Sequence, residues 1–138
     1  MKAAIIMPYS ISWEPKGIYA SFSGFCSVAD VLRAFEDISS DPRSDHIYYA
    51  IFDYLAVEQE NISEAEIEDV AAFDIGLTYS LPNLRFASIT TDERILKLWR
   101  HYFSVHAFPE KLAIFSTLSS ARDWLENSPK TYLIKQGF

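Results

Sequence analysis

The sequence predicts one α/β domain, with a mixed sheet of about five strands and about four helices. Four times, an apolar run typical of a strand is followed by a segment with helical spacing and a polar start. These runs are Ile18–Phe25, Ile47–Leu55, Leu84–Ile89 and Leu112–Phe115. Because parallel strands need a connection about as long as a helix, this alternation predicts that most strands are parallel. Sites in such sheets lie where strands end and helices begin.

The first two strands are expected to form an antiparallel hairpin at one side of the sheet. The short apolar run Ala3–Met7 predicts the first strand, and residues 8–17, with their prolines, predict a connection. Ile18–Phe25 then alternates between two faces, as a strand does. The run Ile47–Leu55 is apolar on both faces, which is typical of a central parallel strand.

Each expected helix begins at a polar residue suited to capping its first turn. Two of these caps have a glutamate three residues later, which predicts a capping box: Glu66 after Ser63, and Glu93 after Thr90. Residues 56–62 are expected to form the loop before the second helix. The full set of expected caps is Ser27, Ser63, Thr90 and Thr117.

The whole chain, 1–138, is expected to form a single domain in which residues 128–138 are a C-terminal tail or edge segment. Within that segment, Thr131–Ile134 is compatible with a final edge strand, a partner contact or a loose tail. The apolar residues there, or the edge of the hairpin, could support a homodimer through edge pairing.

The composition predicts a soluble, cytoplasmic protein of bacterial type. The formal net charge is −7 and the 12 lysines and arginines are scattered, which argues against binding to nucleic acid. No apolar run reaches the ~20 residues of a membrane span. Cys26 is the only cysteine, so no internal disulfide is possible, as expected in a reducing compartment.

Candidate site residues gather in four segments that we call the rim: 25–27, 53–63, 90–92 and 116–117. Several helix N-termini are expected to meet there, where backbone N–H groups could hold an anionic group. Glu58 to Asp69 also contains six acidic residues and no Lys or Arg, which suits a basic partner or a solvated first helical turn. The candidates are Cys26, Ser27, Asp53, Ser63, Glu64, Glu66, Thr91 and Thr117.

Two of these candidates, Asp53 and Cys26, and the further residue Asp74 have a structural explanation beside the functional one. Asp53 is expected to end the central strand, where it could be a working acid or could accept N–H groups of the following loop. Cys26 precedes a helix N-terminus, which can lower a thiol pKa, but a small buried apolar side chain is the preferred explanation. Asp74 interrupts the apolar stripe of the second helix, so it is either a buried acid with a raised pKa or a residue at the core boundary.

Neither a metal nor a cofactor is expected. The three histidines, His46, His101 and His106, lack the spacing of metal ligands. No glycine-rich phosphate loop and no Gly-x-Ser-x-Gly motif occur. Because nothing supplies a base, a nucleophile and an oxyanion site together, we do not expect an enzyme.

Several short strings, in their order along the chain, resemble the SpoIIAA-like proteins of the STAS/CRAL-TRIO-related group. They are residues 17–24 (GIYASFSG), 41–43 (DPR), 85–87 (RFA), 113–115 (AIF) and 121–125 (ARDWL). The resemblance covers residues 3–127 and implies a hairpin followed by βα repeats. It also implies that Ser63 corresponds to a serine that a partner kinase phosphorylates in anti-sigma-factor antagonists. The surrounding string here, Ile-Ser-Glu-Ala, differs from theirs, and the neighbouring glutamates would repel a phosphate.

We therefore expect a non-enzymatic regulatory or protein-interaction module. It would act through the rim and the acidic start of the second helix. The alternative is a carrier of a small apolar or lipid-like ligand between sheet and helices, because CRAL-TRIO relatives hold such ligands there.

Overall fold

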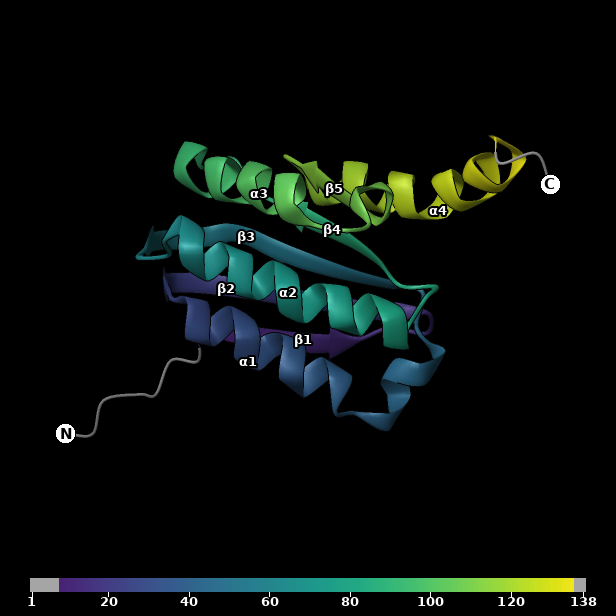
Figure 1. Cartoon of the computed structure of the whole chain (residues 1–138), viewed down its shortest axis with the longest axis horizontal. Coiled ribbons are helices and arrows are strands. Elements are labelled where there is room, and N and C mark those ends of the chain that lie inside the picture. The colour runs from purple at the N-terminus through teal and green to yellow at the C-terminus, as the bar shows by residue number, and fades with distance from the viewer. Residues whose placement is uncertain (1–7, 136–138) are drawn as a thin grey trace.

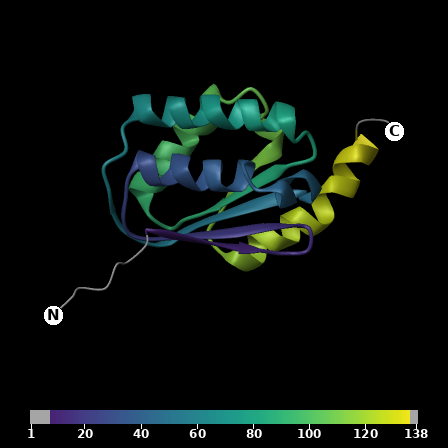
Figure 2. The same cartoon turned by 90° about the horizontal axis from the view of Figure 1, so that it is seen from below.

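The protein is described by a computed structural model covering residues 8–135. One five-stranded sheet carries α1, α2 and α3 on one face and α4 on the other (Figures 1 and 2). The elements in chain order are β1 (Tyr9–Trp13), β2 (Gly17–Cys26), α1 (Val28–Ser39), the 3-10 turn η1 (Pro42–His46), β3 (Tyr49–Glu60), α2 (Glu64–Ser80), β4 (Arg85–Ile89), α3 (Glu93–Val105), η2 (Pro109–Lys111), β5 (Leu112–Phe115) and α4 (Leu118–Lys135).

The strand order is β1-β2-β3-β4-β5, with β1 antiparallel to β2 and every other pair parallel. This confirms the predicted mixed sheet and the N-terminal hairpin. The hairpin strand, however, is Tyr9–Trp13, inside the segment predicted as a connection, so that part of the prediction is wrong. The pattern Tyr-Ser-Ile-Ser-Trp alternates with period two, although prolines flank it on both sides. The predicted strand Ala3–Met7 lies outside the described residues.

Two other boundaries differ from the prediction. The loop predicted over residues 56–62 is wrong in its first part, because β3 continues to Glu60. Register shifts between β2 and β3, at Ser21/Ser23 and at Gly24/Phe25, break the regular alternation that marks a strand in sequence. At the other end of the chain, α4 runs to Lys135, so Thr131–Ile134 is helical and the edge-strand alternative is wrong.

The capping residues follow the prediction at three of four helices. Ser27 and Ser63 cap α1 and α2 in complete capping boxes, and Thr117 accepts the Ser120 N–H at 3.1 Å at the start of α4. The cap of α3 is Asp92 instead of Thr90, since Asp92 Oδ1 accepts the Arg94 N–H at 2.8 Å.

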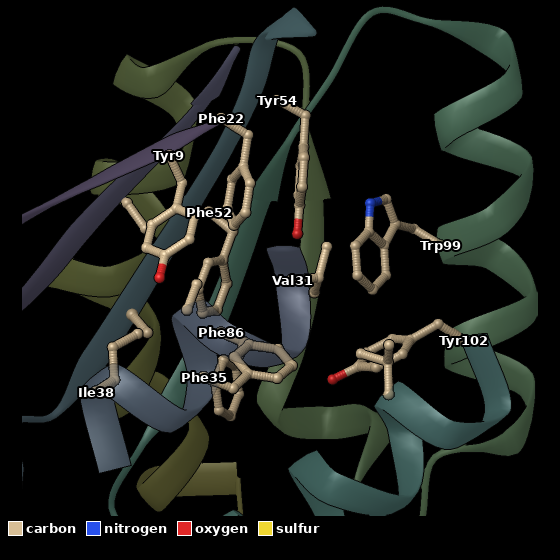
Figure 3. Packing of buried hydrophobic residues seen from close by; sticks show 14 of the residues in the cluster. Tyr9, Phe22, Val31, Phe35, Ile38, Phe52, Tyr54, Phe86, Trp99 and Tyr102 are labelled. Atoms are coloured by element: carbon tan, nitrogen blue, oxygen red, sulfur yellow. The ribbon is translucent and has the colours of Figure 1, made fainter. Parts of the chain in front are cut away.

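The main core is an aromatic layer between the sheet and helices α1–α3 (Figure 3). Phe22 stacks on Tyr54 with 4.8 Å between ring centroids, and Phe35 meets Phe52 edge-on at 4.9 Å. A smaller cluster centred on Ile51, Ala87, Ile89 and Ala121 lies under α4. Two-sided burial of β3 and β4 holds the strand ends, and therefore the rim, in fixed positions.

Candidate functional site

The structure brings the starts of α1, α2 and α3 together at the carboxyl ends of the parallel strands. Cys26, the last residue of β2, is in register with Glu60, the last residue of β3. A small cavity is lined jointly by residues that border these starts, among them Cys26, Glu60, Ile62 and Ile95. The predicted rim residues Cys26, Ser27, Ser63, Glu64, Glu66 and Thr91 therefore share one end of the sheet.

At two of these helix starts, the chain's own capping side chains already occupy donors that an anion would use. Ser27 Oγ accepts the Asp30 N–H at 3.3 Å, and Asp30 Oδ2 accepts the Ser27 N–H at 3.0 Å. Ser63 and Glu66 form the same reciprocal pair at 3.1 and 2.9 Å. Fewer backbone N–H groups are thus free for a ligand, and carboxylates dominate the exposed chemistry of this end.

The charges around these helix starts are mostly negative. Glu64, Glu68 and Asp69 are exposed on α2, and Glu68 lies 3.1 Å from His101 on α3. Arg94 forms an ion pair with Asp92 at 3.1 Å, and its hydrogen bonds lower the pKa of Asp92, while Arg33 lies 3.7 Å from Asp30 in the first turn of α1. This end of the molecule therefore attracts cationic groups.

Cys26 is a buried thiol, only 2% exposed. Burial raises its pKa to about 12, with further contributions from Asp30 and Glu60. The thiol stays protonated at neutral pH, so the helix start beside it does not make it a nucleophile.

Asp53 does not end β3, so that expectation was wrong; it is in register with Ile89, the last residue of β4. It sits seven residues before the end of β3, on the face that carries α4. Its Oδ1 accepts the Leu55 N–H at 2.9 Å, and its Oδ2 accepts the hydroxyl of Tyr19. Burial and this hydrogen bond raise the pKa of Tyr19 to about 12. Thr117 starts its helix on the α4 face, and it follows β5, whose last residue, Phe115, accepts the Thr90 N–H at 3.0 Å.

A polar cluster on the α4 face was not predicted. Arg122 on α4 donates two hydrogen bonds to Glu14 in the β1–β2 turn, at 3.0 and 2.7 Å, and the Tyr49 hydroxyl also donates to Glu14. The contact to Arg122 lowers the pKa of Glu14. The pair ties the hairpin to the last helix. No local pattern could reveal it, because the two residues are 108 positions apart.

Asp74 is a buried acid, and its partner is His106. Both side chains are fully buried, with Asp74 Oδ2 3.2 Å from His106 Nε2. The Phe108 N–H donates to His106 Nδ1 at 2.9 Å, so the hydrogen-bond network assigns the ring proton to Nε2, facing Asp74. Burial raises the pKa of Asp74 to about 6, and the histidine opposes that shift.

Two small cavities lie on either side of Trp99, each of about 10 Å³. Such a volume holds about one water molecule. Tyr54 lines one of them, and its buried hydroxyl has no hydrogen-bond partner among the described residues. Figure 3 shows this hydroxyl pointing between Phe86 and Trp99. Neither of these two cavities would hold an apolar ligand of carrier size unless Trp99 or its neighbours moved.

Within residues 8–135, His, Cys, Asp and Glu side chains form no group of three or more that could hold a metal ion. No helix in this part of the chain combines the length and apolar character that a membrane crossing requires.

Comparisons with known proteins show the fold. No protein-family profile matches the chain, and no curated protein matches it. Among solved structures, the chain is similar to an uncharacterized protein of the DUF3478 family from Shewanella loihica PV-4, which has a SpoIIAA-like fold. The TM-score is 0.53 at 16% sequence identity, over 91% of this chain and 99% of that one. The chain therefore has a SpoIIAA-like fold, as its sequence strings suggested.

Proposed function

We propose that this protein is a non-enzymatic interaction module that binds a basic protein partner through the rim and the acidic start of α2. The observation that carries this proposal is the convergence of three helix starts at one end of the sheet. There, capping side chains occupy backbone donors while carboxylates remain exposed. Lys and Arg side chains of a partner would find complementary charge there.

The test compares two variants with the same change in net charge. The first reverses Glu64, Glu68 and Asp69 to lysine and leaves Glu66 in its capping box. The control reverses three exposed acids elsewhere, Glu36, Glu110 and Glu126. Proteins crosslinked to the native chain in cells of its source should be lost with the first variant and kept with the control. If both variants keep or both lose the same crosslinked proteins, the acidic start of α2 is not the binding surface.

A carrier of a small apolar ligand is the alternative function. It requires the space on either side of Trp99 to open, since each cavity holds about 10 Å³. Native mass spectrometry of freshly purified protein tests it: a retained ligand adds mass, and a spectrum of the bare chain alone counts against a carrier.

A further inference from the structure

We propose that β1 is an interface at which two copies of this chain join their sheets edge to edge. This surface is separate from the rim, so the proposal does not depend on the proposed function. β1 is the first strand in the sheet order and has a neighbour, β2, on one side only. Figure 2 looks toward this side of the molecule, and no helix passes in front of β1.

The hydrogen-bond pattern of the hairpin shows which backbone groups of β1 face outward. Ser23 donates to the Pro8 carbonyl at 2.9 Å, and Glu14 donates to the Gly17 carbonyl at 2.8 Å. In an antiparallel pair, such hydrogen-bonded positions recur at every second residue. Residues 8, 10, 12 and 14 therefore face β2 with their backbone groups.

The intervening residues Tyr9, Ile11 and Trp13 direct their N–H and C=O groups away from β2. The described part of the chain supplies no hydrogen-bond partner for these groups. Soluble proteins usually protect such an edge with a charge, a proline or a bulge. Tyr9–Trp13 contains no charged residue and no proline, and its pairing with β2 has no register shift.

The strand is complementary to itself in an antiparallel arrangement. A two-fold axis at Ile11 places this residue opposite Ile11 of the second copy, and places Tyr9 opposite Trp13. Tyr9, Ile11 and Trp13 of one copy then exchange backbone hydrogen bonds with Trp13, Ile11 and Tyr9 of the other copy. The arrangement also forms two aromatic cross-strand pairs, which stabilise antiparallel sheets.

Charges beside β1 favour the same arrangement. The Tyr9 hydroxyl donates to Asp37 at 2.5 Å, and the Arg43 guanidinium lies 4.2 Å from the centroid of the Trp13 ring. Both charged side chains are exposed, and Arg43 also pairs with Asp41 of its own chain at 2.7 Å. Because Tyr9 of one copy would lie beside Trp13 of the other, Asp37 would approach Arg43 across the interface. The two-fold symmetry forms this contact twice, and this identifies a second copy as the occupant.

In such a dimer the two rims would lie at opposite ends of one continuous sheet, since the joined strands are antiparallel. Taken together with the proposed function, the dimer would present two copies of the partner-binding surface. It could then bridge two partner molecules or two sites on one partner.

Sedimentation of the full chain tests the proposal. The native protein should form a dimer. Asp37→Arg and Arg43→Glu should each weaken it by at least about tenfold, because each replaces two attractive contacts with repulsive ones. An equimolar mixture of the two variants should recover the dimer. In the mixed dimer, the arginine introduced at position 37 would face the glutamate introduced at position 43, and the native Arg43 would face the native Asp37. Glu93→Arg, the same type of charge change on α3, serves as control and should leave the dimer intact.

A backbone variant adds an independent readout. Ile11→Pro removes an outward N–H and leaves the hydrogen bonds to β2 in place, so it should fold by circular dichroism and sediment as a monomer. A native protein that is monomeric at every concentration would overturn the proposal. So would a mixture of the two charge variants that associates no better than either variant alone.

Discussion

Asp74→Asn tests how the buried acid on the inner face of α2 affects the stability of the protein. Burial raises the pKa of Asp74 from 3.8 to about 6. The folded protein thus binds this proton more tightly than the unfolded chain does. Stability from this group is fully present below about pH 4 and is lost as the pH rises to about 6. A shift of this size corresponds to about 3 kcal/mol at neutral pH.

Asparagine keeps the shape of Asp74 and can still accept the His106 Nε2–H, but it carries no charge. The difference in unfolding free energy between Asp74→Asn and the native protein should therefore change by about 2 kcal/mol in favour of the variant between pH 4 and pH 7. The absolute difference in stability also includes a cost from the new amide. Asp74 Oδ1 has no hydrogen-bond partner in the described part of the chain, so an N–H₂ group at that position would be a buried, unpaired donor. The slope with pH is therefore the informative quantity.

Urea unfolding followed by tryptophan fluorescence, repeated from pH 4 to pH 7.5, measures this slope. The titratable side chains that interact with Asp74 are His106 and Tyr54, and both remain in the variant. Asp69→Asn removes one negative charge from the exposed side of the same helix and serves as the reference. If the curves for Asp74→Asn and the native protein run parallel over the whole range, burial does not hold Asp74 at a raised pKa.

Two further substitutions and one labelling experiment each test a single side chain. Arg122→Met should lower stability by about 1 kcal/mol at pH 7 by urea unfolding. The loss should shrink as the pH falls through the pKa of Glu14, which the contact to Arg122 lowers, because protonation of Glu14 weakens the native pair as well. An equal loss in strongly acidic and neutral solution would contradict an ionic contact. Tyr54→Phe removes a buried hydroxyl that has no hydrogen-bond partner among the described residues. Thermal unfolding should therefore show no loss of stability, or a gain of up to about 1 kcal/mol. A clear loss would mean that a water molecule or a ligand forms a hydrogen bond with this hydroxyl in the native protein. Cys26 should react slowly with a thiol reagent at pH 7 and rapidly after unfolding, and fast labelling of the folded chain would contradict its raised pKa.

The sequence was sufficient to predict the alternation of strands and helices, and the parallel direction of most strands, because each βα unit carries its own signals. An apolar run, a cap such as Ser63 and an amphipathic helix are all local features. The hairpin was misplaced although its alternation is visible in residues 9–13, because prolines on either side are also typical of a connection. The end of β3 was missed for a different reason: bulges depend on the neighbouring strand, and one strand alone does not reveal them.

For the candidate site, sequence reasoning located the helix starts and misplaced Asp53. That residue was expected to end β3, but the strand continues for seven residues beyond it. Asp74 was noticed because an acid interrupts an apolar stripe. Its partner His106 lies 32 residues away, and only the packing of α2 against the segment after α3 brings the two together.

Some charged side chains of this protein form pairs that stabilise the fold, whereas others are exposed and available for binding. Arg122 is committed to Glu14, and His106 to Asp74, so these polar groups hold elements of the fold together. The exposed acids at the start of α2 contribute little to the fold beyond a favourable interaction with the helix dipole, which is small for solvated side chains. Reversing Glu64 and Asp69 should therefore leave the free energy of unfolding within about 1 kcal/mol of the native value. A loss of binding without such a loss of stability would assign these carboxylates to recognition, whereas a loss of both would assign them to the fold.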